Sequence, residues 1–151
     1  MRMPIAGVML DSRMRIPLRE LMSRDLLTVV PEDTLGEAAE KMAGKGVGAA
    51  LVMDAGRLVG ILTERDLLAA VAARVQTSEA PVREWMTESP LTVPEATSIE
   101  RAASIMVTRG FRHLPIVDGE RSIGIVSLRD VVRSVVRVYP EYEDDAEDDG
   151  E

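Results

Sequence analysis

An ungapped internal repeat is the feature that most constrains the fold of this 151-residue chain. Shifting the sequence by 64 residues lays residues 17–71 over residues 81–135, and 18 of the 55 paired positions are then identical. Many of the other pairs match one apolar residue with another. The chain is therefore expected to contain two copies of one structural unit, because both copies carry the same pattern of buried and exposed positions.

Each copy predicts the same order of secondary structure. A short helix that begins at proline and a brief extended segment come first, and a longer helix follows. In the first copy that longer helix starts at a capping box of Thr34 and Glu37, and in the two copies it ends at Gly46 and Gly110, where a left-handed residue is usual. Two strands joined by a tight turn and a closing helix complete the unit. The predicted strands are residues 49–53 and 57–63 in the first copy, and residues 113–117 and 121–127 in the second.

The expected fold class is α/β (α+β), with two β-α-β-β-α repeats. One such unit cannot bury both faces of its small sheet. Two copies packed sheet to sheet would bury them, and would create a pseudo-two-fold axis with two equivalent clefts. The predicted organisation is an N-terminal segment (1–16) that packs on the module or on a second subunit, a first repeat (17–76), a second repeat (81–138) and an acidic disordered tail (139–151).

The formal net charge of −8 comes from the tail. Residues 141–151 hold eight acidic residues and no basic one, which leaves 18 acidic and 18 basic residues in residues 1–140. Such a run is typical of a solvated, disordered segment, and no basic face indicates nucleic-acid binding. The chain has no cysteine, and no apolar run approaches the roughly 20 residues of a membrane span. We therefore expect a cytoplasmic protein with no membrane or nucleic-acid partner.

The most informative motif occurs once in each copy, as GILTERD at residues 60–66 and GIVSLRD at residues 124–130. In both, a strand ends, a hydroxyl residue takes the N-cap position of the next helix, and an aspartate lies in its first turn. A hydroxyl and helix N-terminal amides favour an anion such as phosphate, an arginine can add a charge-assisted contact, and a carboxylate can accept hydrogen bonds from ribose hydroxyls. The same pattern is an ordinary helix cap, and the two roles are compatible. The residues concerned are Thr63, Arg65 and Asp66, and Ser127, Arg129 and Asp130.

The repeat resembles the cystathionine-β-synthase (CBS) domain, and the two copies together resemble the tandem pair called a Bateman module. The resemblance covers about residues 17–136 and rests on MTESPLTV at residues 86–93, on RHLPIVD at residues 112–118 and on the two motifs above. It implies an adenine nucleotide (AMP, ADP or ATP) or another adenosyl ligand (S-adenosylmethionine, NAD or a cyclic dinucleotide), bound as a regulatory ligand with no required cofactor. In the family the hydroxyl residue meets phosphate, the aspartate meets ribose, and the base lies against strand residues of the opposite repeat.

Carried over to this sequence, the resemblance implies two clefts. The Asp66 cleft would combine Thr63, Arg65 and Asp66 with Thr87, Leu91, Phe111 and Arg112, and the Asp130 cleft would combine Ser127, Arg129 and Asp130 with Ser23, Leu27, Val47 and Gly48. His113 is either structural or a further phosphate contact in the Asp130 cleft, and Phe111 either stacks on a base or fills the core. Because Gly48 would leave room for the base, the Asp130 cleft is expected to bind the nucleotide more tightly.

The sequence does not favour an enzyme. It has one histidine and no metal-ligand cluster, and the two motif aspartates are spaced for ribose contacts and not as a paired acid and base in one cleft. The function expected is a ligand sensor that changes conformation on binding and so regulates a partner protein, whose identity the sequence does not reveal. The alternative is an interaction module with empty clefts that acts through its surface and acidic tail. A homodimer is expected because the module leaves helix faces to cover and the family commonly forms dimers.

Overall fold

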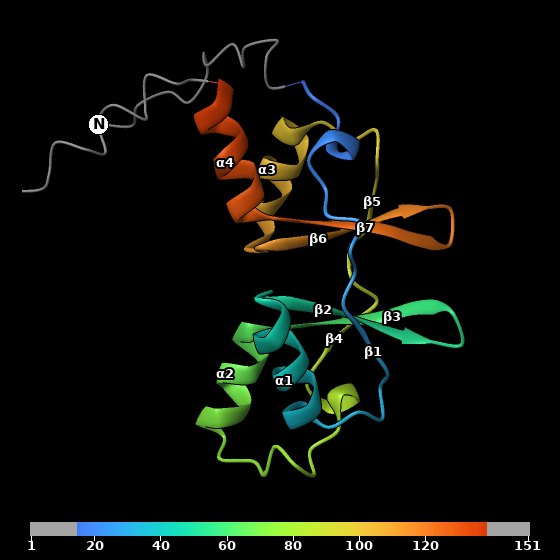
Figure 1. The fold of residues 1–151 in the computed structure, drawn as a ribbon, viewed down its shortest axis with the longest axis vertical. Coiled ribbons are helices and arrows are strands. Elements are labelled where there is room, and N and C mark those ends of the chain that lie inside the picture. The colour runs from blue at the N-terminus through green and yellow to red at the C-terminus, as the bar shows by residue number, and fades with distance from the viewer. Residues whose placement is uncertain (1–14, 139–151) are drawn as a thin grey trace, which may run out of the picture.

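The computed structural model describes residues 15–138, in which the two repeats form two units stacked sheet against sheet (Figure 1). The first unit has a four-stranded sheet in the order β1-β2-β3-β4, and the second has a three-stranded sheet in the order β5-β6-β7. Helices α1 and α2 cover the outer face of the first sheet, and α3 and α4 cover the outer face of the second. The sheets therefore face each other between two helical layers, which is the α+β architecture predicted from the repeat.

The strands of the first unit are β1 (Thr28–Val29), β2 (Ala49–Asp54), β3 (Arg57–Thr63) and β4 (Thr87–Glu88), and those of the second are β5 (Val93–Pro94), β6 (His113–Asp118) and β7 (Arg121–Ser127). The helices are α1 (Leu35–Lys45), α2 (Glu64–Ala72), α3 (Ile99–Arg109) and α4 (Leu128–Val138), with two short 3-10 helices, η2 (Leu18–Glu20) and η3 (Val82–Glu84). In each unit a parallel pair (β1 with β2, β5 with β6) is followed by an antiparallel hairpin (β2 with β3, β6 with β7).

The helix boundaries follow the local signals in the sequence. Thr34 Oγ1 accepts a hydrogen bond from Glu37 N (3.2 Å), and Glu37 Oε2 accepts one from Thr34 N (2.9 Å), which confirms the predicted capping box at α1. Gly46 and Gly110 end α1 and α3 with φ angles of 68° and 71°, in the left-handed region that favours glycine.

Strand alternation divides the buried side chains between three clusters. In β2, Ala50 and Val52 pack beneath α1 and α2, whereas Ala49 and Leu51 point the other way, because successive side chains of a strand leave opposite faces. Ala49, Leu51 and Ile61 are packed together with Ile125 of the second unit, and this cluster joins the two sheets. The contact between the two sheets is thus apolar at this cluster.

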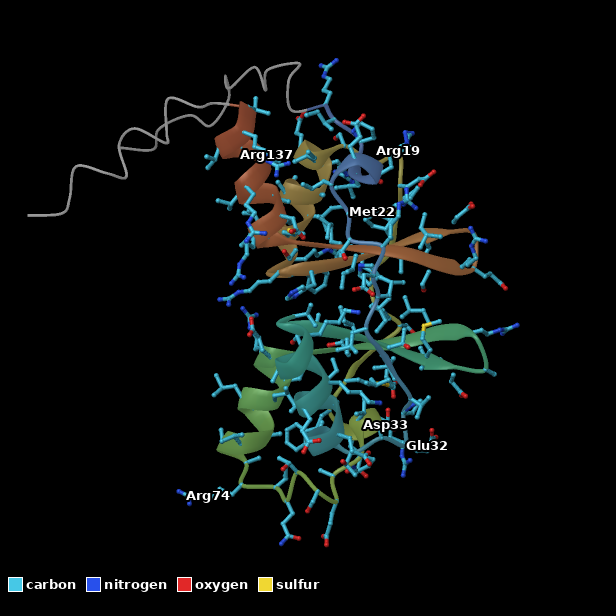
Figure 2. All side chains as sticks on the ribbon, viewed as in Figure 1. Arg19, Met22, Glu32, Asp33, Arg74 and Arg137 are labelled. Carbon is cyan, nitrogen blue, oxygen red and sulfur yellow. The ribbon has the colours of Figure 1, made fainter. Side chains whose placement is uncertain are left out.

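The short N-terminal segment of each repeat packs on the other unit. Leu18 of η2 is fully buried in the core of the second unit, and Val82 of η3 is fully buried in the core of the first. The same exchange brings β4 beside β3, and pairs Ser23 with Ile125 through two backbone hydrogen bonds (2.9 and 3.0 Å). Figure 2 shows Met22 beside the sheet of the second unit. Each structural unit therefore combines most of one sequence repeat with the N-terminal segment of the other repeat.

The predictions for the acidic tail and for most of the N-terminal segment concern residues 1–14 and 139–151, which lie outside the described residues. Ile16, at the start of the described chain, packs against the core of the second unit. Within residues 15–138, no helix combines the length and apolar character that a membrane span requires.

Candidate functional site: a cleft between the two units

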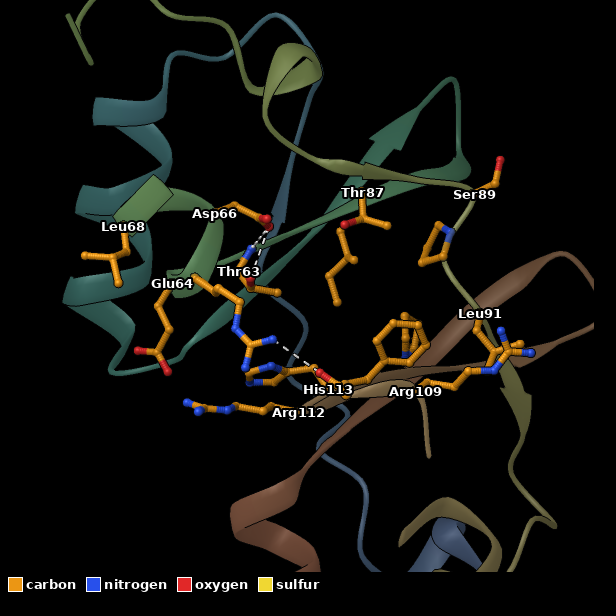
Figure 3. A pocket seen from close by; sticks show the side chains of 16 residues that line it. Thr63, Glu64, Asp66, Leu68, Thr87, Ser89, Leu91, Arg109, Arg112 and His113 are labelled. Carbon is orange, nitrogen blue, oxygen red and sulfur yellow. Dashed lines mark hydrogen bonds between the residues drawn. The ribbon is translucent and has the colours of Figure 1, made fainter. Parts of the chain in front are cut away.

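A cleft of about 810 Å³ lies between the two units, beside the motif of Thr63 and Asp66 (Figure 3). The N-terminus of α2 forms one wall, the segment around β4 a second, and the end of α3 with the start of β6 a third. The cleft is lined by all seven residues expected in the Asp66 cleft, namely Thr63, Arg65, Asp66, Thr87, Leu91, Phe111 and Arg112. Its volume is in the range of sites for small molecules and cofactors.

The motif aspartates cap their helices, as the helix-capping interpretation predicts. Asp66 Oδ2 accepts hydrogen bonds from Thr63 N (2.8 Å) and Thr63 Oγ1 (3.0 Å). In the second copy, Asp130 Oδ2 accepts from Ser127 N (2.8 Å) and Ser127 Oγ (2.8 Å). Within residues 15–138 all these bonds go to Oδ2, so that Oδ1 of each half-buried carboxylate keeps its capacity to accept from a ligand.

The first amide of α2 is not available to an anion. Glu64 N donates to Gly48 O (3.0 Å), and the equivalent Leu128 N donates to Arg112 O (2.8 Å). These bonds tie each motif helix to the start of the first hairpin strand in the same unit. The Thr63 hydroxyl donates to Asp66 Oδ2 (3.0 Å), so phosphate binding at α2 would depend on amides further along the first turn and on cationic side chains.

The Asp66 cleft has an apolar part and a charged part. Phe111, Leu91, Pro90, Pro115 and Ile61 supply apolar surface, and Leu91 is 40% exposed although it is a large hydrophobic residue. Arg65 Nη1 donates to Gly110 O (3.3 Å), which draws its guanidinium toward the facing wall. Apolar surface beside arginines and a carboxylate suits a ligand that has an aromatic ring and a polar tail.

His113 lines the Asp66 cleft, and it also lies beside Gly48 of the expected Asp130 cleft, since a Cβ atom built on Gly48 would be 3.4 Å from His113 Cε1. Strand alternation is the reason: Leu114 and Ile116 enter the core of the second unit, and His113 points toward the first unit. Burial lowers the pKa of His113, the carboxylates of Glu64 and Asp130 oppose this effect, and Arg112 adds to it. The imidazole thus lies between the two motif helices and close enough to both to sense their charges.

Among the residues expected in the Asp130 cleft, Ser23, Val47 and Arg129 are exposed, and Gly48, Ser127 and Asp130 are half-buried. Ser23 is paired with β7, and Leu27 packs against the core of the first unit. A Cβ atom built on Gly48 would be only 3.0 Å from Glu64 Oε1 and 3.4 Å from His113 Cε1. The exposed side chain of Glu64 therefore lies against Gly48, and its backbone N donates to Gly48 O.

Sequence reasoning missed two charged residues that line the Asp66 cleft, Glu64 and Arg109. A signal for both was present in the repeat, since Glu64 replaces Leu128 and Arg109 replaces Lys45 at equivalent positions. Lys45 is bonded to Asp25 (Nζ to Oδ1, 2.7 Å). Arg109 lies beside Leu91 at the apolar end of the cleft (Figure 3).

Comparison with known proteins agrees with this architecture. The CBS domain family model matches residues 18–73 and 82–137. The CBS domain-containing protein YhcV of Bacillus subtilis is 35% identical over 114 residues, which cover 76% of this chain and 81% of that protein. The crystal structure of the CBS domain protein NE2398 has a TM-score of 0.77 and 30% identity, and covers 80% of this chain and 98% of that one.

Two further structures contain ligands. CBSX2 in complex with AMP has a TM-score of 0.69 and 30% identity, and covers 81% of this chain and 97% of its own. The CBS domain pair of MJ0100, in complex with 5′-methylthioadenosine and S-adenosyl-L-methionine, has a TM-score of 0.71 and 27% identity, and covers 78% and 94%. From the repeat, the fold and these matches, we conclude that the chain belongs to the CBS domain family and contains a tandem pair of CBS domains.

Proposed function

We propose that this protein is a regulatory sensor, and not an enzyme, that binds an adenosine-based ligand in the Asp66 cleft. The observation that carries the proposal is the position of Asp66. Its carboxylate borders a cleft of about 810 Å³ with Oδ1 still able to accept hydrogen bonds, and Phe111 and Leu91 supply an apolar wall in the same cleft. The related CBS pairs solved with AMP and with S-adenosyl-L-methionine support an adenosine-based ligand.

In this proposal each part of the ligand has a matching part of the cleft. The ribose diol donates to Asp66, whose ionised carboxylate gives stronger hydrogen bonds than a neutral acceptor would. The base lies in the apolar part, where Phe111 can stack on it. A 5′ substituent then extends toward Thr63 and Arg65. Burial of the base supplies most of the affinity, and the polar contacts select the orientation.

The regulatory step follows from the fact that both units line the cleft. A ligand held at α2 and at β6 favours one relative position of the units, and it can shift that equilibrium only by its difference in affinity for the two positions. Exposed apolar residues lie on the outer helices, with Val71 of α2 63% exposed and Val132 of α4 54% exposed. We propose that a second copy of the chain or the regulated protein covers these helix faces.

A thermal-shift panel tests the proposed function. A ligand at a hundred times its dissociation constant adds about 2.7 kcal/mol of stability, which raises Tm by roughly 5–10 °C for a chain of this size. The panel contains AMP, ADP, ATP, S-adenosylmethionine, NAD and cyclic di-AMP, with cytidine monophosphate as the control for the base. If none of the adenosine compounds changes Tm at millimolar concentration, the sensor proposal is wrong and the interaction-module alternative replaces it.

A further inference from the structure

The exposed side of α4 carries three arginines at regular spacing. Arg129, Arg133 and Arg137 are all exposed and follow one another at intervals of four residues. Residues four apart are neighbours on a helix surface, so these side chains form one stripe with an arginine about every 6 Å along the axis. We call these three residues the arginine stripe. It lies on the outer helical layer of the second unit (Figure 1), and Val132, three residues after Arg129 and 54% exposed, adjoins it.

The repeat shows that the fold does not require the arginine stripe. The equivalent positions of the first copy are Arg65, Ala69 and Ala73. Both alanines are exposed, so the side chain at these positions is not needed for packing. Arginines at the second and third positions therefore occur only in the helix that leads into the acidic tail.

The arginine stripe has no anionic partner among residues 15–138. None of the ion pairs formed there involves its three members, and Asp130, the single acidic residue of α4, is engaged with Ser127. Like charges four residues apart repel each other and weaken a helix, and Arg129 in the first turn also opposes the helix dipole. An anionic segment that covers the stripe would remove both penalties.

Residues 141–151 of the acidic tail have the charge and the spacing to cover the stripe. An acidic residue occupies every odd-numbered position from 141 to 151. Alternate side chains of an extended chain leave the same side at intervals of about 6.6 Å, close to the spacing of about 6 Å between the arginines. The acidic residues of an extended tail can therefore meet the stripe in register.

The tail also begins at the right place. Pro140 follows the end of α4 by two residues and disfavours a continuation of the helix, so the chain can reverse direction there. The stripe is about 12 Å long from Arg137 to Arg129, which corresponds to about four residues of extended chain. The first half of the tail is thus long enough to run back over the whole stripe.

We infer that residues 141–147 run back along α4 and pair with the arginine stripe of the same chain. Three residues separate Arg137 from Glu141, and so short a connection gives a roughly millimolar effective concentration, which favours the same chain over a second copy. The paired tail competes with acidic segments of other proteins for the stripe and for the adjoining Val132. The pairs stay exposed to solvent, and exposed pairs add little stability, so Tm does not measure them. The inference is independent of a ligand in the Asp66 cleft.

A spin label on the tail of the full chain tests the inference. The chain contains no cysteine, so the single cysteine of Ala146→Cys can be labelled alone, on the side of the tail opposite the odd-numbered acidic residues. The label broadens the amide signals that lie near it in isotope-labelled protein. Broadening within α4 should increase from Arg137 toward Arg129, because residue 146 of a returning tail lies beside the start of the helix. Most of it should disappear in about 1 M salt, where the screening length is about 3 Å and not the roughly 10 Å of 0.1 M salt.

A pair of double variants shows whether the arginine stripe holds the tail. Arg133→Gln with Arg137→Gln should remove most of the broadening near Arg129. Arg57→Gln with Arg121→Gln is the matched control, because it removes the same charge from the exposed first residues of β3 and β7, and it should leave the broadening unchanged. Circular dichroism of each variant shows that it is folded.

The inference is overturned if broadening decreases steadily from Arg137 to Arg129, as it does for a tail that extends from the end of α4 into solvent. It is also overturned if the control variant loses as much broadening as the stripe variant. A mixture of isotope-labelled protein without the spin label and spin-labelled protein without the isotope tests for pairing between copies. Equal broadening of α4 in this mixture would assign the tail to the stripe of a second copy and exclude the same-chain arrangement.

Discussion

Replacing Gly60 with alanine should destabilise the protein, because the backbone of the exchanged segment passes directly over this glycine. A Cβ atom built at Gly60 would lie 2.5 Å from Met86 Sδ, 3.0 Å from Met86 Cγ and 3.1 Å from Thr87 O. Met86 can adopt another rotamer, but the Thr87 carbonyl is held in place by the pairing of β4 with β3. Thr87 also lines the Asp66 cleft, so the strain arises at the candidate site itself.

The expected loss follows from two opposing effects. Inserting a methyl group into a filled space typically costs 1–3 kcal/mol, and alanine recovers about 0.5–1 kcal/mol through the smaller entropy of its unfolded chain. We expect a net loss of about 1–2 kcal/mol, or a Tm lower by roughly 3–6 °C. Gly124→Ala should behave alike, because its Cβ would lie 2.5 Å from Met22 Sδ and 3.2 Å from Ser23 O.

Urea unfolding followed by circular dichroism measures this difference. Gly44→Ala is the matched control, since Gly44 lies in α1 and its Cβ would meet nothing within 4 Å. Alanine is the better helix former by up to about 1 kcal/mol, so this variant should be more stable than the wild type. If Gly60→Ala proves as stable as Gly44→Ala, the close approach of β4 to Gly60 does not exist in solution.

Three further predictions concern other parts of the chain. Leu18→Ala should cost about 2–5 kcal/mol in urea unfolding because the side chain is fully buried in the second unit, and a cost below about 1 kcal/mol would contradict the exchange of segments. The free energy of unfolding should fall as the pH drops below about 6.5, because burial lowers the pKa of His113 in the folded protein and the unfolded chain then binds the proton more readily. His113→Gln should flatten this part of the plot of stability against pH. An unchanged plot would count against the buried imidazole. Removing residues 141–151 should leave Tm and AMP affinity unchanged, since the sequence predicts a solvated tail, and a large drop in Tm would show that the tail is docked.

Local sequence patterns determined the secondary structure of each unit. The capping box of Thr34 and Glu37, the glycines that end α1 and α3, and the alternation of the hairpin strands act between residues that are close in the chain. Such local signals do not depend on where the segment packs in the folded protein, and the helix ends and strands predicted from them are confirmed. The repeat adds that two units must coexist, and the motif, with the family resemblance, predicted seven residues that do line one cleft.

The tertiary structure decided the contacts between residues that are far apart in the sequence. The pattern of Leu18 and Val82 is the same whether each packs on its own repeat or on the other, because the two cores are alike; only the path of the connecting segments selects the exchange. The sequence also could not show that Glu64 covers Gly48, or that His113 faces the first unit. These contacts join residues of separate elements, and they distinguish two clefts that the repeat alone would make equivalent.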